Sequence, residues 1–389
     1  MKERPLGQAN SFGLAKVLNR NRRIRMSANR YKERITKLQR LLEQTDVEAV
    51  IVASAANLFY FTGVWIEAHE RLLALAVRRN GAVLLVAPDL HRGELDPVGL
   101  PIVYWRDGDD AAKLLGDALP ESGAVGVDEA WPSGHLLGLM KYRTDVSWTG
   151  GADLLGKLRR VKDRDELDLL RESASALNRV MQSFVPLIRE GRSEAELLEE
   201  LQQLWKREGI RELSFAPTVA TGPNGANPHH TPGDAVVRKG DLIIIDTGGK
   251  LDHYCSDMTR TFSVGEPSEE QRTVYELVKK AHLEGIRAVR PGAAFSDIDR
   301  IVRGVIEEGG YGPYFTHRTG HGIGIDVHEE PAVQDGNGLA IEPGMVFSIE
   351  PGVYLPGKFG VRIEDIVIVT EDGCESVNDV VSKELRVLG

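Results

Sequence analysis

The feature that most constrains this chain is a set of side chains able to bind metal, four carboxylates and one imidazole, in its C-terminal part. Each lies in a short segment rich in glycine, proline or strand-forming residues. If the fold brings the carboxylates together, they repel one another and must protonate or be neutralised by cations; two divalent ions would balance them. Because a two-metal site activates water, the set predicts hydrolytic chemistry. Its members are Asp246, Asp257, His321, Glu350 and Glu364.

The length and composition describe a two-domain globular protein. A chain of 389 residues exceeds one ordinary hydrophobic core, and 42% hydrophobic and 27% charged residues are typical of soluble proteins. The net charge of −10 argues against nucleic acid as a partner, and no stretch approaches the roughly 18 to 20 apolar residues of a membrane helix. Cys255 and Cys374 form no CxxC pair, which favours reduced thiols in a cytoplasmic protein.

The N-terminal part of the chain divides into a tail and a first domain. Residues 1–28 are rich in Lys and Arg and lack the apolar stretch of a secretory signal, so we expect a flexible basic tail; sequence upstream of a true start at Met26 and a nucleic-acid-binding arm are the alternatives. Residues 29–157 predict an α/β domain, in which Asn80-Gly81 indicates a hairpin. The expected strands are 49–54, 72–78, 82–87, 101–105 and 124–128, and the expected helices are 30–45, 109–119 and 134–142.

Residues 158–389 predict an α+β domain in which helices cover a mostly antiparallel sheet. Residues 159–184 have the charged amphipathic pattern of one long helix. Ser193 and Glu196 have the spacing of a capping box, which marks the start of another helix. The other expected helices are 193–208, 268–289 and 296–309.

Two of the acids belong to a predicted hairpin. Residues 241–246 form a buried-type strand that ends in Asp246, and residues 254–262 have the pattern of a returning strand that carries Asp257. The Gly-Gly pair after the first strand permits a tight turn. A hairpin would place both carboxylates side by side, although two acids at exposed strand ends would give the same pattern.

Two histidines lie in a glycine-rich segment. His321 has glycine on both sides, and glycine permits close backbone approach, so the segment is expected to press against another part of the fold. A lone histidine is more often structural than a ligand, but this frame favours a ligand. His328 begins a His-Glu-Glu-Pro sequence rather than HExxH, which makes it a candidate donor to a substrate carbonyl or developing oxyanion.

The remaining candidates lie on a strand end and in a loop. Glu350 ends an apolar strand over 345–350. Arg362 and Glu364 are two residues apart, as on one face of a strand, and an inward-facing acid needs a cation that Arg362 or a metal could supply. His229 and its neighbour His230 lie in a proline-rich loop, where histidines are usually solvated, and periodicity does not settle their role.

With these residues in place, the chain resembles the pita-bread metallopeptidases, specifically the branch of prolidase and aminopeptidase P. The resemblance covers residues from about 160 to 370, and a weaker signature, NLFYFTG (57–63), resembles the smaller N-terminal domain of this family. It implies an α/β N-terminal domain followed by an α+β pita-bread catalytic domain. The matching segments are IIIDTGGKLDHYCSDMTRTF, HRTGHGIGIDVHEEP, VFSIEPGVYLPG and GVRIED.

The resemblance implies a role for each candidate. Asp246 and Asp257 would chelate one metal, with Asp257 also reaching the second. His321 and Glu350 would hold the second metal, and Glu364 would bridge both. A metal-bridging hydroxide would attack the scissile carbonyl while Glu350 carries the proton to the leaving nitrogen. His229 and His328 would contact the substrate or stabilise the tetrahedral intermediate, and Arg362 would orient the acids.

This ligand set of hard oxygen donors suits two divalent ions, Mn²⁺ first, with Co²⁺ or Zn²⁺ as substitutes. The predicted activity is cleavage of the Xaa-Pro bond of dipeptides or short proline-containing peptides. The alternatives are an Xaa-Pro aminopeptidase acting on longer peptides, a related pita-bread hydrolase or lyase acting on a small non-peptide substrate, and a non-catalytic binding protein. All five ligand positions are filled here, which favours the hydrolase.

A dipeptidase must also recognise the free carboxylate of proline, for which His229, His328 and Arg318 are candidates. No arginine occurs in residues 331–341, where some prolidases supply one. The family also implies a homodimer. Residues 58–61 and Trp65 are either a contact surface near a neighbouring active site or part of the N-domain core.

Overall fold

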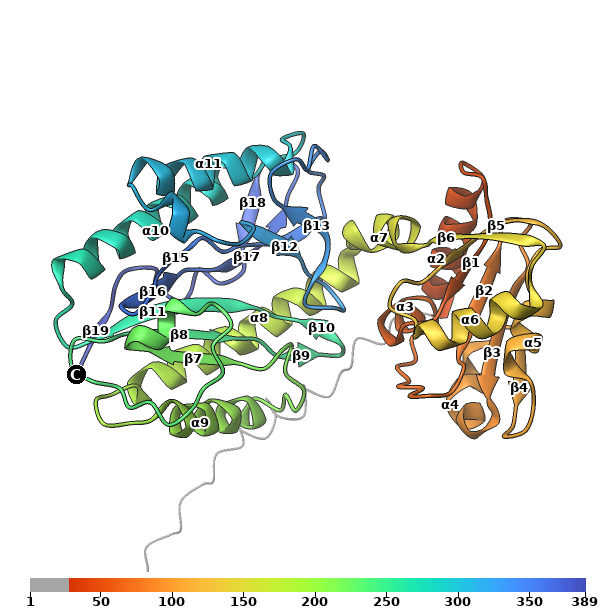
Figure 1. The fold of residues 1–389 in the computed structure, drawn as a ribbon, viewed down its shortest axis with the longest axis horizontal. Helices are drawn as coiled ribbons and strands as arrows, with labels where there is room; N and C mark the ends of the chain where they lie inside the picture. The colour runs from red at the N-terminus through yellow and green to blue at the C-terminus, as the bar shows by residue number, and fades with distance from the viewer. Residues whose placement is uncertain (1–27) are drawn as a thin grey trace, which may run out of the picture.

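The computed structural model describes residues 28–389, so the basic tail predicted over residues 1–28 lies almost entirely outside the described part of the chain. The described chain forms an N-terminal α/β unit and a C-terminal α+β unit, joined by two successive helices (Figure 1). None of its helices is long and apolar enough to cross a membrane.

The N-terminal unit is built on a six-stranded mixed sheet with the order β4-β3-β2-β1-β5-β6. The predicted hairpin is confirmed: β2 and β3 pair antiparallel, and Gly81 in the turn between them has a φ of +92°. All five predicted strands are present, and β6 is an additional strand at the sheet edge. The strands are β1 (Val47–Val52), β2 (Ala74–Arg78), β3 (Val83–Pro88), β4 (Ile102–Trp105), β5 (Gly123–Val127) and β6 (Val146–Gly150).

Helices pack on this sheet, and one of them settles the position of the NLFYFTG segment. This segment forms α3, which begins after the capping residue Ser54 and ends at Gly63, whose φ is +74°. Residues 58–61 are buried in the core, so of the two alternatives for them the core is right. Trp65 is half-buried and stacks on His253 of the C-terminal unit, with ring centroids 4.6 Å apart. The helices are α2 (Ala28–Leu42), α3 (Ala55–Thr62), α4 (Arg92–Leu95), α5 (Ala111–Asp117) and α6 (Ser133–Tyr142).

The C-terminal unit contains two main sheets, of four strands (β19-β11-β8-β7) and of five (β13-β12-β14-β17-β18), and all but one of their strand pairs are antiparallel. Figure 1 shows the sheets between two pairs of helices, α8 with α9 and α10 with α11. The strands are β7 (Thr218–Thr221), β8 (Leu242–Thr247), β11 (Met258–Val264), β12 (Gly320–Gly322), β13 (Glu329–Val333), β14 (Val346–Ile349), β17 (Asp365–Val369), β18 (Cys374–Ser376) and β19 (Val387–Leu388), with the two hairpins β9 (Lys250–Leu251)–β10 (Tyr254–Cys255) and β15 (Gly352–Leu355)–β16 (Phe359–Arg362).

Each helix pair covers one sheet, and the layers are held by separate apolar cores. Side chains of α8 and α9 pack on β7, β8 and β11, and side chains of α10 and α11 pack on β14 and β17. The capping box of Ser193 and Glu196 is confirmed at the start of α9. The helices are α7 (Ala152–Arg160), α8 (Arg164–Phe184), α9 (Glu194–Arg207), α10 (Glu269–Ala288) and α11 (Phe295–Glu308).

The long helix predicted over residues 159–184 is present as α8 and ends where expected, but it begins at Arg164, because the chain breaks between α7 and α8. Val161 forms a β-bridge with Met345. Asp163 then caps α8 in a capping box with Glu166, so these acids lie at the start of the helix. This break carries the chain from the N-terminal unit into the C-terminal layers.

The junction between the two units is packed and charged. One apolar core includes residues of α2, α3, α7, α8 and β14, and therefore spans both units. Arg159 of α7 donates to Asn57 and Asp326 and also contacts Glu329, while Lys162 lies 3.2 Å from the same glutamate. Burial alone would raise the pKa of Glu329, but the two cations outweigh it and lower that pKa to about 2.

Burial of the 58–61 segment predicts a large cost for truncating Phe61, which is 1% exposed. Phe61→Ala should lower the free energy of unfolding by about 3 to 5 kcal/mol, whereas Leu90→Ala, at a 61% exposed side chain of the same unit, should change it by less than about 0.5 kcal/mol. Urea unfolding followed by tryptophan fluorescence measures both. Equal stability of the two variants would contradict the core placement.

Candidate metal centre

The first two acids are placed by the β8–β11 hairpin. Asp246 lies opposite Thr259 in the antiparallel pairing of β8 with β11. Asp257 comes two residues before Thr259, so its side chain points to the same face of the sheet. The chain does not turn at the Gly-Gly pair as predicted but at Asp252 and His253, between β9 and β10. Gly248 is instead required by close backbone approach, because a Cβ there would lie 1.8 Å from the carbonyl oxygen of Ser256. The predicted hairpin therefore brings both carboxylates to one site.

The two glutamates come from the facing sheet, at the end of the β14–β17 ladder. Ile349 pairs with Asp365, so Glu350 and Glu364 are the next residues on their two chains and emerge side by side. The backbone N–H of Glu350 donates to Thr319 at 2.8 Å, and that of Glu364 donates to Thr259 at 3.1 Å. The second bond joins the two sheets at the site.

His321 lies on β12 with the glycine frame that the sequence indicated. A Cβ at Gly320 would lie 1.9 Å from the carbonyl oxygen of Ser348, and one at Gly322 would lie 2.5 Å from that of Glu330. The Nδ1 of His321 is 3.0 Å from the Gly322 carbonyl oxygen, which can only accept, so Nδ1 carries the proton. Its Nε2 therefore presents a lone pair.

That lone pair faces the carboxylates. His321 Nε2 lies 3.3 Å from Glu350, 3.7 Å from Asp257 and 4.0 Å from Glu364. Ligand atoms of Asp257, His321 and Glu364 all lie within 4.8 Å of one another, and all three residues are buried. The fold thus gathers an imidazole and carboxylates from both sheets around one point.

The electrostatics of this cluster fit bound cations. Among the described residues, Asp246 Oδ1, Asp257 Oδ1 and Glu364 Oε1 are buried oxygens without a hydrogen-bond donor. Burial raises the pKa of Asp257 and that of Glu364 well above their ordinary values, and the neighbouring carboxylates raise both further. Burial also raises the pKa of Glu350 to about 7. Cations at the orphaned oxygens would remove these costs.

Arg362 is the cation that the protein itself supplies to this cluster. Its Nη2 donates to Asp246 Oδ2 at 2.6 Å and its Nε donates to the Thr259 hydroxyl at 3.1 Å. That hydroxyl donates in turn to Glu364 Oε2 at 2.7 Å. Arg362 ends β16, whereas Glu364 lies in the short connection to β17 rather than on the same strand, so the shared strand face predicted for them is replaced by a shared threonine.

The neighbouring histidines of the proline-rich loop have different surroundings. His230 Nε2 lies 2.7 Å from Glu194, a fully buried carboxylate at the start of α9 that also accepts from the backbone of Thr221 and Gly233. His230 therefore anchors the loop. His229 is exposed and follows Pro228, whose carbonyl oxygen accepts from Arg362 Nη1 at 3.5 Å, so the loop passes beside the cluster.

His328 and Arg318 border the cluster. The His328 ring meets the His321 ring edge-on, with centroids 4.3 Å apart. Burial, together with the charges of His328 and Arg318, lowers the pKa of His321 to about 3. His328 also lines a pocket of about 210 Å³ between the two units, with Asn57 and Arg159 on its N-terminal side.

Two residues of this region escaped the sequence analysis. Tyr354 accepts from Arg362 Nη1 at 2.9 Å, and its hydroxyl lies 2.8 Å from His317 Nε2. Together they fix the guanidinium that binds Asp246. A tyrosine in an apolar strand was the available signal, because a buried phenol needs a polar partner.

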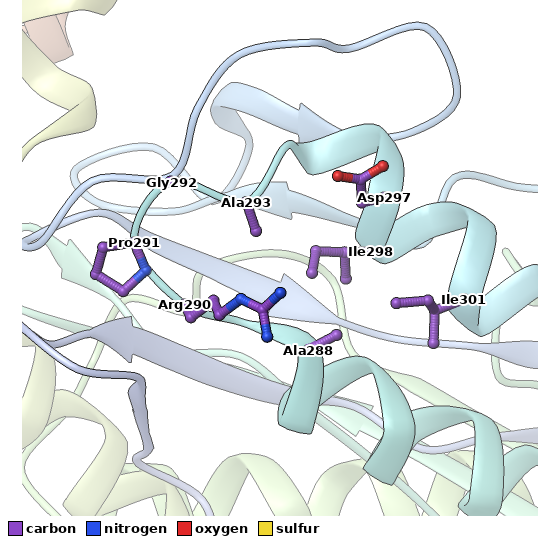
Figure 2. Close-up of a pocket in the computed structure, with 8 residues that line it drawn as sticks. All are labelled: Ala288, Arg290, Pro291, Gly292, Ala293, Asp297, Ile298 and Ile301. Atoms are coloured by element: carbon purple, nitrogen blue, oxygen red, sulfur yellow. The ribbon is translucent and has the colours of Figure 1, made fainter.

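Another hollow, of about 430 Å³, lies where α10 turns into α11 (Figure 2). It is lined by backbone and small or apolar side chains together with Arg290 and Asp297. None of the predicted site residues borders it, so the cluster and not this hollow is the candidate site.

Comparisons with known proteins agree with this geometry. Residues 168–371 match metallopeptidase family M24, and residues 34–161 match the Creatinase/Prolidase N-terminal domain. The chain is 38% identical to a probable dipeptidase PepE of Mycobacterium tuberculosis over 362 residues, which cover 91% of this chain and 96% of that protein.

Solved structures give the same result. A recombinant prolidase from Thermococcus sibiricus is 39% identical with a TM-score of 0.88, covering 92% of this chain and 99% of that one. The dipeptidase PepE from Mycobacterium ulcerans is 36% identical with a TM-score of 0.89, covering 94% and 99%. An α/β N-terminal domain followed by an α+β pita-bread catalytic domain is therefore confirmed, and the chain belongs to metallopeptidase family M24.

Proposed function

We propose that the protein is a metal-dependent Xaa-Pro dipeptidase acting on dipeptides or short peptides with proline in the second position. The observation that carries the proposal is the buried convergence of Asp257, His321 and Glu364 with carboxylate oxygens that lack any donor. Relatives of similar length are named dipeptidase and prolidase. The X–Pro bond is a tertiary amide without an N–H, which favours a dedicated enzyme.

We propose that Asp246, Asp257, His321, Glu350 and Glu364 hold two divalent ions, with Mn²⁺ preferred and Co²⁺ or Zn²⁺ able to substitute. When bound, the ions would supply an activated water and a Lewis acid for the scissile carbonyl. In this proposal Arg362 orients the Asp246 carboxylate through its 2.6 Å contact.

The remaining roles follow from charge and position. Glu350, whose carboxylate lies 3.3 Å from His321 Nε2 at the edge of the cluster, would take up a proton and pass it to the leaving proline nitrogen. His328 and His229 border the cluster and would donate to the substrate carbonyl. Arg318 would bind the proline carboxylate. Within the described chain its guanidinium, unlike that of Arg362, does not contact any of the proposed metal ligands.

An Xaa-Pro aminopeptidase acting on longer peptides is the second candidate, since residues 331–341 contain no arginine to close the site behind a dipeptide. A related hydrolase or lyase with a small non-peptide substrate is a third. We further propose that the protein is a cytoplasmic homodimer. Its chain would divide into a tail over residues 1–28, an N-terminal domain over 29–157 and a catalytic domain over 158–389.

Substrate length separates the first two candidates. With Mn²⁺, purified protein should cleave Xaa-Pro dipeptides with a kcat/KM at least about tenfold higher than that for Xaa-Pro-Yaa-Zaa, because a bound proline carboxylate contributes about 1.4 kcal/mol or more. Comparable rates on the tetrapeptide would assign the aminopeptidase activity, and no turnover of either would leave the non-peptide substrates.

Removal of the shared carboxylate should abolish the metal centre. Asp257→Asn should lose one or both ions and at least about 100-fold of kcat, because a neutral amide cannot replace a buried anionic ligand. Metal content by mass spectrometry and peptide turnover check this. Asp252→Asn, at an exposed acid in the neighbouring β9–β10 turn, is the matched control and should retain both. Full activity of the first variant would contradict the role of Asp257.

The raised carboxylate pKa values predict how pH affects metal-free protein. Because the folded pKa of Glu350, about 7, exceeds its ordinary 4.5, the folded state binds more protons than the unfolded state between these values. Stability of metal-free protein should therefore fall as pH rises from about 5 to 8. Added Mn²⁺ should raise Tm more at pH 8 than at pH 5.5, as calorimetry can measure. An equal Tm increase at both pH values would argue against a carboxylate-bound ion.

A further inference from the structure

A fully buried histidine of α10 lies directly behind the metal centre. His282 Nδ1 is 3.0 Å from the carbonyl oxygen of Ile349, and its Nε2 is 3.3 Å from Asp365 Oδ2. Ile349 precedes Glu350 in the chain, and Asp365 follows Glu364. One imidazole thus contacts the neighbours of two candidate ligands, on the side away from the cluster.

The first of these contacts has a defined direction. A carbonyl oxygen can only accept, so His282 donates from Nδ1 to Ile349. This bond restrains the last peptide of β14 at the point where the chain turns Glu350 toward His321. The N–H of Glu350 donates to Thr319, so the peptide group between Ile349 and Glu350 is held at both its carbonyl oxygen and its N–H.

Arg260 of β11 does the same for the other glutamate. It is 1% exposed, and its Nη1 donates to the carbonyl oxygen of Glu364 at 2.7 Å. Its Nη2 donates to Asp365 Oδ1 at 2.7 Å. Asp365 Oδ2 further accepts from Ser376 at 2.9 Å and from Lys383 at 2.7 Å, so it is well held without His282.

Packing keeps the histidine in place. Gly285, one turn later on α10, is so close to the sheet that a Cβ there would lie 3.0 Å from Ile349 Cγ2 and 2.6 Å from Val302. The helix therefore cannot move away from β14 without losing these contacts. The surrounding face of α10 is apolar, and Val278, one turn earlier, is fully buried in the same core. A leucine at position 282 would satisfy that core without a buried polar group.

We propose that His282 is a positioning residue for the metal centre: by donating from Nδ1 to Ile349 it sets the direction in which Glu350 presents its carboxylate to the ion. The proposal rests on the metal centre proposed above. The contact with Ile349, and not the contact with Asp365, carries the role, because Asp365 keeps its other donors.

Two polar variants of His282 distinguish its contact with Ile349 from its contact with Asp365. The amide nitrogen of asparagine stands two bonds from Cβ, as Nδ1 does, and that of glutamine stands three, as Nε2 does. His282→Asn should keep the donor to Ile349 and bind Mn²⁺ within about threefold of wild type. His282→Gln should lose it and weaken Mn²⁺ binding about 10- to 100-fold, as loss of a residue that orients a ligand typically does. Titration calorimetry on metal-free full-length protein measures both.

Val278→Ala is the matched control for a weakened helix. It should lower Tm without changing the Mn²⁺ affinity. The visible absorption of Co²⁺-loaded protein is a second readout: it should shift in His282→Gln and remain as in wild type in His282→Asn and Val278→Ala.

Each result has a defined meaning. Wild-type affinity in His282→Gln, equal losses in both histidine variants, or an equal loss in Val278→Ala would overturn the positioning role and leave the metal centre intact. Wild-type protein that binds no Mn²⁺ would overturn the metal centre itself, and this proposal with it.

Discussion

Mutual repulsion among buried carboxylates is the constraint on which the catalytic domain depends. Asp246 and Asp257 come from one sheet and Glu350 and Glu364 from the other, so separation of the charges would require separation of the sheets. The Glu364 N–H bond to Thr259 opposes that separation. Arg362 neutralises one acid directly, and the charge that remains is what a pair of divalent ions would balance.

Much of this centre could be predicted from sequence because its ligands lie where secondary structure changes. Glu350 comes directly after an apolar strand, Asp246 lies near the end of another, and glycines frame His321. Each of these patterns has a direct physical explanation. The break at residues 161–163 could not be predicted in the same way. Only Val161, Lys162 and Asp163 separate α7 from α8, and both helices are amphipathic, so the helical pattern runs on across the break.

The residues that support the ligands were missed for a different reason. Tyr354, His317 and His282 all have partners distant in sequence, and each lies in a segment whose other members are apolar or unremarkable. A single polar residue in such a pattern is usually core or surface, and only the fold decides which atoms it meets. For the same reason, the segment 58–61 fitted a contact surface as well as it fitted a core.

The two histidines of the centre are held by different parts of the molecule. His321 lies within the catalytic sheet, between β13 and β14, and its position follows from the glycine backbone contacts there. His328 lies between Asp326 and Glu329, both of which are bound by Arg159 of the linking helix α7. Glu329 also pairs with Gly322, the residue after His321, and the apolar core that spans both units includes Val346 of β14, the strand that ends before Glu350. The N-terminal unit therefore packs behind the residue proposed to meet the substrate and also against strands that carry proposed metal ligands.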